Sequence, residues 1–325
     1  MPVSVVFENI FDGTVYAAKK ERRKPPKARR TQTMTKKVGA EFIKAQEALG
    51  EDLPDRALSI LENLLRREEL RDFEKAQITR LQAYVWAEKD DYPKAMIYLQ
   101  RAFSYNALQP QDQLDLQYQI AQLHLALDKW KEGEVLLTQW FEDAEALGSP
   151  PGPSAHALLA QIYLYFASDE KKDSPEEAQF YRKAEPHAQI AVFRATEPRE
   201  NWYQLYLSVL LFDDRYEEAV PILEAMVYRF PEKKNYYRQL AALYAELRRE
   251  KDSFQIQQIM HNKGMLEKHD ELLRISQLYL YYDIPFKAAI IMEKELEDGR
   301  IKDEEKYWEQ LANAWLSSRE WRKAI

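Results

Sequence analysis

The chain has 325 residues, 46% apolar and 31% charged, with a net charge of −7, so two domains or a repeat array are expected rather than one compact core. It has no cysteine, which excludes disulfides, zinc–thiolate sites and thiol catalysis. It also lacks any run of 18 apolar residues, so no membrane-spanning helix is expected. Only 8 glycines, and little valine beside leucine, alanine, glutamate and lysine, favour helices over sheets.

The N-terminal segment, residues 1–35, is expected to be disordered. Residues 19–30, KKERRKPPKARR, hold eight Lys/Arg against one Glu, a composition that cannot bury a core. This basic tail is either a solvated linker or a tether to an acidic partner, a lipid surface or nucleic acid. The stretch before it does not match a clean export signal, because it lacks a basic start and Glu8 and Asp12 interrupt its apolar part. It nevertheless ends at Ala17 in small residues, as at a cleavage site.

A recurring frame covers the rest of the chain. In WEQLANAW (308–315) and YRQLAALY (237–244), a bulky residue, a Leu-Ala pair and an aromatic residue stand two spacers apart. A second small residue follows each copy further along the chain. These later residues are Ala57, Ala95, Gly133, Ala184, Ala219, Ser253, Ala288 and Ala324, separated by 38, 38, 51, 35, 34, 35 and 36 residues.

This frame and period are typical of tetratricopeptide repeats (TPRs), which are helical hairpins of 34 residues. We predict an all-α fold, a right-handed α-solenoid of TPR hairpins over residues 36–325, with about eight units of which the last is incomplete. The small residues let the paired helices approach closely, and large neighbours fill the space between hairpins. The tyrosine and tryptophan stripe is therefore assigned to packing and not to a cofactor.

The 51-residue interval contains an insertion of about a dozen residues within 168–186. Ser174-Pro175 followed by two glutamates predicts a helix start, and the hairpin is expected to have lengthened helices or an extra turn. The Gly/Pro-rich stretch 148–153 is predicted to be a loop. A bend in the solenoid is predicted between residues 145 and 185.

The chain closes on three tryptophans, Trp308, Trp315 and Trp321. The first two occupy signature positions of a final first helix, and the third begins a second helix that the sequence does not complete. We therefore expect a C-terminal truncation that leaves these rings partly uncovered, at an edge that is frayed or covered by a neighbouring chain.

No catalytic, cofactor-binding or metal-binding residues are predicted, because no HExxH, GxSxG, GxGxxG or phosphate-cradling loop occurs. His124 and His156 fall on packing positions of the repeat, whereas His261 and His269 are expected to be solvated. An enzyme or a nucleic-acid binder is a remote alternative, since the chain outside the basic tail is acidic and repels phosphates. No cofactor and no small-molecule substrate are expected.

A protein or peptide partner is what the architecture favours, because the first helices of a solenoid line an extended concave surface. The positions beside each small residue of a first helix are expected to face that groove, where amides and phenols can bind an extended peptide. The alternative is that they are ordinary exposed polar positions. The candidate peptide-binding residues are Arg80, Tyr84, Tyr118, Gln122, Gln161, Arg238, Leu273, Gln277 and Asn313.

Three stretches, residues 29–49, 198–247 and 272–301, resemble TPR proteins encoded beside TonB, ExbB and ExbD. The resemblance implies a periplasmic, non-enzymatic protein–protein interaction scaffold that assists TonB-dependent energy transduction, with a TonB-system component as partner. A general cell-envelope assembly scaffold is the alternative, and a cytoplasmic location is kept open because the export signal is not intact. Contact with a membrane is expected only through partners or the basic tail.

Overall fold

The computed structural model of the protein describes residues 32–324, which form fifteen helices and no strand. Of the segment expected to be disordered, residues 1–35, residues 1–31 lie outside the described residues. The chain divides into two compact units, one ending at Gly152 and the other beginning at Pro153. The boundary falls in the predicted loop 148–153. The predicted bend between residues 145 and 185 stays a prediction.

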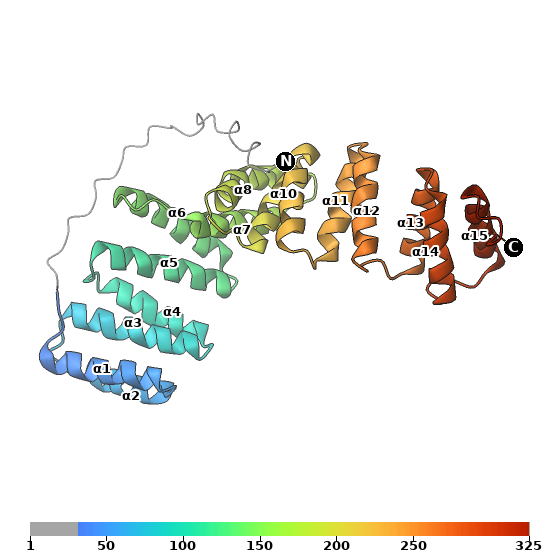
Figure 1. The fold of residues 1–325 in the computed structure, drawn as a ribbon. Coiled ribbons are helices and arrows are strands. Elements are labelled where there is room, and N and C mark those ends of the chain that lie inside the picture. Colours follow the sequence, from blue (N-terminus) through green and yellow to red (C-terminus); the bar gives the residue numbers. More distant parts are fainter. Residues whose placement is uncertain (1–31, 325) are drawn as a thin grey trace. The chain divides into compact units, whose positions relative to one another are not determined.

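Unit 1 consists of three helical hairpins (Figure 1). Each pairs a first helix with a second helix that runs back along it, and the small anchor residues sit between them. The helices are α1 (Lys36–Gly50), α2 (Pro54–Leu65), α3 (Asp72–Glu88), α4 (Tyr92–Ser104), α5 (Pro110–Ala126) and α6 (Trp130–Ala146).

Unit 2 continues the pattern with four hairpins and one further first helix. Its helices are α7 (Pro153–Asp169), α8 (Pro175–Phe193), α9 (Glu200–Phe212), α10 (Tyr216–Arg229), α11 (Lys234–Glu246), α12 (Glu250–Asn262), α13 (His269–Tyr281), α14 (Pro285–Glu297) and α15 (Glu305–Ser317). Seven complete hairpins and a lone first helix confirm the predicted repeat array with an incomplete last unit.

The turns inside the hairpins share one backbone conformation. The second residue after the first helix has a positive φ in every hairpin except the α7–α8 pair, where the connection is longer. Aspartate tolerates this left-handed conformation better than most residues and is the commonest choice here. These turn residues are Asp52 (φ 59), Asp90 (φ 57), Asp128 (φ 56), Asp214 (φ 53), Arg248 (φ 56) and Asp283 (φ 58).

Close approach of the paired helices depends on the predicted small residues. Ala57, Ala95, Ala219 and Ala288 are fully buried. At Gly133 a Cβ atom would lie 2.7 Å from Leu125 Cδ2, so even an alanine methyl is too large for the α5–α6 contact as it stands. The repeat therefore conserves volume at these points because two helix backbones must approach there.

The insertion lengthens the α7–α8 hairpin, as predicted. Helix α8 has 19 residues, more than any other described helix, and begins where expected. The Ser174 hydroxyl accepts a hydrogen bond from the Glu177 amide at 3.1 Å, and Pro175 is the first helical residue. Pro186 lies inside the helix, where it removes one backbone donor.

The closing tryptophans differ in exposure. Trp308 and Trp321 are 42% and 62% exposed, which agrees with the expectation of uncovered rings. Trp315 is fully buried, so that part of the expectation was wrong. The Phe286 ring of α14 lies 5.6 Å from the Trp315 ring and the Lys323 Nζ lies 4.2 Å from it, so the preceding hairpin and residue 323 together supply the cover.

Candidate binding surface

The nine predicted groove residues all lie on first helices, distributed over both units. Six are exposed, as ligand contacts must be: Tyr84 and Gln122 in unit 1, and Gln161, Arg238, Gln277 and Asn313 in unit 2. Their use as a peptide-binding groove stays a prediction.

The other three predicted residues are partly buried and make packing contacts. The Arg80 guanidinium lies 3.4 Å from the Asp112 carboxylate, which links α3 to α5. The Tyr118 ring lies 4.7 Å from the Trp140 ring, and Leu273 packs against the buried apolar cluster of α11–α15. These side chains hold hairpins together, which limits what they can offer a ligand.

In unit 1, a buried glutamate joins the first two hairpins. Glu74, the third residue of α3, is 1% exposed and accepts hydrogen bonds from the Thr35 amide at 2.7 Å and the Arg71 guanidinium at 3.0 Å. Thr35 immediately precedes α1, so this carboxylate ties the start of α1 to α3. The Arg71 side chain, together with the Thr35 and Arg71 amides, lowers the pKa of Glu74 to about 2 against the opposing effect of burial.

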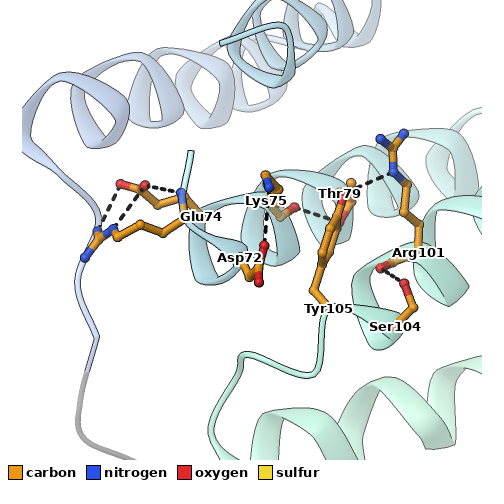
Figure 2. A network of polar contacts seen from close by, with 8 residues as sticks. Asp72, Glu74, Lys75, Thr79, Arg101, Ser104 and Tyr105 are labelled. Atoms are coloured by element: carbon orange, nitrogen blue, oxygen red, sulfur yellow. Dashed lines mark hydrogen bonds and ion pairs between the residues drawn. The ribbon is translucent and has the colours of Figure 1, made fainter. Parts of the chain in front are cut away.

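The surroundings of Glu74 are occupied by local contacts (Figure 2). Lys75 lies 3.3 Å from Asp72, one turn away on α3. On the adjacent α4, the Arg101 Nε donates to the Tyr105 hydroxyl at 3.1 Å. These pairs stabilise the ends of α3 and α4, and none combines a nucleophile with a base that could serve catalysis.

In unit 2, polar contacts link consecutive first helices at separations close to the repeat period. The Tyr236 hydroxyl donates to Glu200, 36 residues away. His269 Nε2 lies 3.1 Å from the Tyr307 hydroxyl, 38 residues away, and His269 Nδ1 accepts from the Lys302 amide at 3.2 Å. The expectation that His269 is solvated was therefore wrong, because α15 and the segment before it cover the ring.

Glu271 makes the most extensive of these links. Glu271 is the third residue of α13. Its carboxylate accepts hydrogen bonds from Lys234 Nζ at 2.9 Å and from the Arg238 guanidinium, both on α11. The amides of residues 267 and 268 donate to the same carboxylate at 3.2 and 3.3 Å. Burial opposes ionisation of this group, but the hydrogen bonds from Lys234, Arg238 and the two amides outweigh it and lower its pKa to about 2.

A pocket of about 370 Å³ lies beside this link, between α11, α12 and α13. Its interior is formed by buried residues of small or apolar type, and its rim by exposed ones. The lining residues are Arg238, Ala241, Ala242, Ala245, Ser253, Gln257, Met260, Leu266, Glu271 and Arg274. Of the nine predicted groove residues, only Arg238 reaches it.

Three alanines of α11 mark this pocket in the sequence. Residues 241, 242 and 245, in the stretch AALYA, place three alanines along one side of α11. The buried apolar side chains of unit 2 form two clusters, one over α7–α11 and one over α11–α15, and buried Ala241 belongs to neither. The pocket borders the second cluster through Met260 and Leu266.

A second pocket, of about 500 Å³, lies in unit 1 between α4, α5 and α6. Its wall is mostly apolar and includes Phe103, Ile120 and the exposed Val135. His124 borders it, and burial lowers the pKa of this histidine. No charged pair is arranged across this pocket in the way that Arg238 and Glu271 face the first one.

Two histidines meet inside the α7–α8 hairpin. The Nδ1 atoms of His156 and His187 lie 2.8 Å apart, so at least one ring must be neutral to accept the hydrogen bond. Burial lowers the pKa of both to about 4, and the positive charge of His156 contributes to the shift at His187. His156 is buried, in keeping with its predicted packing position. His187 directly follows the insertion, away from the repeat signature, and the sequence pattern assigned it no role.

Neither a metal site nor a membrane-spanning helix is found in residues 32–324. No three His, Asp or Glu side chains in this range lie close enough together to hold a metal ion. None of the helices in the described part of the chain combines the length and the apolar character needed to cross a membrane. The candidate site that remains is the surface of first helices α11 and α13 with the pocket between them.

No family model matches the chain, and no curated protein sequence matches it. Similarity appears in solved structures. The C-terminal part of a TPR repeat-containing protein from Cytophaga hutchinsonii superposes with a TM-score of 0.50 at 12% identity, over 83% of this chain and 99% of that one. A tetratricopeptide repeat protein from Parabacteroides merdae gives 0.48 at 13% identity, over 86% of this chain and 99% of that one. The fold is thus that of tetratricopeptide-repeat solenoids.

Proposed function

We propose that this chain is a non-enzymatic protein-binding scaffold that receives a peptide segment on the first helices of unit 2. The observation that carries the proposal is the pocket of about 370 Å³ between α11 and α13, bordered by the predicted residue Arg238. TPR arrays present extended surfaces of this kind to other proteins. The exposed residue Gln277, on the next turn of α13, extends the same surface beyond the pocket.

The partner we propose is a component of the TonB–ExbB–ExbD system in the periplasm. The support is the resemblance of residues 29–49, 198–247 and 272–301 to TPR proteins encoded with that system. Two of these stretches contain α11 and residues 272–281 of α13, the helices that border the pocket. The basic residues 19–30 offer a second contact of opposite charge to the rest of the chain.

Site-specific photo-crosslinking in intact cells tests this proposal. A photoreactive amino acid is introduced at Ala242 or Gln277 on the proposed surface, and at the exposed Lys251 of α12 as the matched control. The expected result is a TonB-system protein attached at positions 242 and 277 and absent at 251.

Recovery of only envelope-assembly proteins at these positions overturns the TonB assignment and leaves the scaffold function. Equal products at all three positions overturn the proposed surface as well. Osmotic-shock fractionation of the same cells tests the periplasmic location, since a protein retained entirely with the cytoplasm contradicts it.

A further inference from the structure

The pocket between α11 and α13 has the features of a receptor for one short stretch of peptide. Its volume of about 370 Å³ is at the low end of ligand pockets, which run from roughly 300 to 1,000 Å³. It therefore accommodates one large side chain with its neighbour and not a folded element. The interior surface is supplied by Ala241, Met260 and Leu266, all buried.

These interior residues favour an apolar side chain. Alanine and methionine side chains offer no charge to compensate a buried polar group, whereas an apolar anchor gains free energy by leaving water. The polar atoms inside are already engaged. The Ser253 hydroxyl donates to the Ala241 carbonyl at 2.8 Å, and the Gln257 amide lies 3.5 Å from Ser253.

The rim of the pocket has a different chemistry. Three charged residues stand there, Arg238, Glu271 and Arg274. Glu271 is neutralised by Lys234 and Arg238 from α11, as described above. Arg274 is exposed and has no hydrogen bond or ion pair to any described residue, so its guanidinium is available to a ligand.

The region around the pocket is locally basic within an acidic protein. Residues 231–274, which supply every lining residue, carry nine Lys/Arg against seven Asp/Glu, whereas the chain as a whole has a net charge of −7. A ligand carboxylate placed at Arg274 can form a bidentate pair, the geometry in which arginine binds carboxylates most strongly. The rest of the acidic surface disfavours the same ligand elsewhere.

We propose that this pocket binds a peptide in which a bulky apolar residue is adjacent to an aspartate or glutamate, with the apolar side chain in the alanine-lined interior and the carboxylate on Arg274. This assignment rests on the proposed scaffold function and specifies its ligand. The acidic residue is placed in the interior of the peptide and not at its terminus, because the exposed Gln277 extends the surface of α13 beyond the pocket.

The test uses the full 325-residue chain and an array of nonapeptides, acetylated and amidated at their ends. One set contains Leu or Phe followed by Asp or Glu; a second replaces the acid by Asn or Gln; a third replaces the apolar residue by Ala. Binding constants of the best pairs are then measured in solution by fluorescence anisotropy. We expect the first set to bind at least about fivefold tighter than either control, with the preference over the amide set falling as salt is raised.

Three variants separate the parts of the proposal. Arg274→Gln is expected to abolish the preference for acid over amide and to keep the preference for the apolar residue. Ala245→Leu, which adds bulk at an exposed position on the rim, is expected to weaken all pocket ligands. Arg182→Gln, at an exposed arginine of α8 away from the pocket, is the matched control and leaves binding unchanged.

An acid preference that survives Arg274→Gln overturns the assignment, as does binding that Ala245→Leu leaves intact. Circular dichroism of each variant distinguishes lost binding from lost folding. The proposed function fails separately. If crosslinks form at Ala242 and Gln277 but no peptide of the first set is preferred, the scaffold stands and the ligand class is wrong.

Discussion

Glu74 in unit 1 and Glu271 in unit 2 make the same kind of contact between neighbouring repeats, but their surroundings differ. Each is the third residue of a first helix and accepts hydrogen bonds from backbone amides just before that helix. Each also contacts the preceding repeat: Glu74 binds Thr35, the residue before α1, and Glu271 binds side chains of α11. Glu74 is 1% exposed and binds the backbone of Thr35, whereas the Glu271 side chain is 17% exposed and binds the long side chains of Lys234 and Arg238.

The difference shows how one repeat can serve either stability or binding. A backbone partner has a fixed position, so Glu74 ties the start of α1 directly to α3. The partners of Glu271 are the flexible side chains of Lys234 and Arg238 on α11. A pocket lies beside this contact, and Arg238 and Glu271 line it. We call the contact at Glu74 the closed joint, because it serves structure alone. We call the contact at Glu271 the open joint, because the pocket beside it is accessible to a ligand.

The largest expected loss of stability follows from removing Glu74, at the closed joint. Glu74→Ala leaves the Thr35 amide and the Arg71 guanidinium without their acceptor, which is expected to lower the free energy of unfolding by about 2 to 4 kcal/mol. Urea denaturation measures the loss, and hydrogen exchange locates it in α1. Glu47→Ala, at an exposed position of α1, is the control and should change stability by less than about 0.5 kcal/mol. Equal effects of the two variants contradict the structural role of Glu74.

The interior of unit 1 is expected to tolerate no added volume. Gly133→Ala places a methyl group 2.7 Å from Leu125, an overpacking cost of about 1 to 3 kcal/mol that exceeds the gain of about 1 kcal/mol in helix propensity. The net result is a lower melting temperature by calorimetry. Gly39→Ala in α1, where the nearest atom is 3.6 Å away, is the matched case and should raise stability. A stabilised Gly133→Ala variant means that the Leu125 side chain moves aside at little cost.

The histidine pair of α7–α8 and the buried glutamate Glu74 are expected to respond to acid in different ranges. The pKa of His156 and His187 is lowered to about 4 from 6.5, so the unfolded chain takes up protons first and the stability of unit 2 falls as the pH decreases from 6.5 to 4. The pKa of Glu74 is lowered to about 2 from 4.5, so its contribution to unit 1 is complete above pH 4.5 and disappears as the pH falls towards 2.

Denaturation at a series of pH values, followed by hydrogen exchange of each unit, measures these ranges. His156→Gln should remove on the order of 1 kcal/mol of the change between pH 6.5 and 4. His261→Gln, which alters a histidine outside the α7–α8 pair, should retain most of it. An identical pH profile in wild type and His156→Gln contradicts the role of the histidine pair.

The smallest expected loss of stability follows from neutralising Glu271, at the open joint. Glu271→Gln keeps the shape of the side chain and removes the charge that holds Lys234 and Arg238, at a cost of about 1 kcal/mol because both partners remain hydrated. Faster hydrogen exchange at the start of α13, with little change in melting temperature, is the expected signature. A loss as large as that of Glu74→Ala would show that the two joints are equivalent.

Much of the fold could be predicted from spacing. The anchors near a 34-residue period, such as Ala95, Ala219 and Ala288, predict where second helices must approach first helices, and the structure buries them. The start of α8 at Ser174-Pro175 follows from local capping chemistry alone. Recurrent aspartates such as Asp90 and Asp128 mark the turns and could have been used to place them.

The site could be predicted only in part, because exposure and free volume are not local properties. Arg80, Tyr118 and Leu273 occupy the same repeat positions as exposed groove residues, yet neighbouring helices cover them. His269 and Trp315 were expected at the surface and are covered by the adjacent hairpin. Whether a neighbour covers a residue depends on contacts one repeat away, which no short pattern contains.

By itself, the sequence determined the helical hairpins, their number and their anchor residues, since these follow from backbone propensity and from the volume of single side chains at a regular spacing. Tertiary structure alone decided which joint between hairpins is closed by Glu74 and which is left open beside Glu271. The physical reason is that a pocket is the space that remains after packing, and packing is settled by all the surrounding helices together.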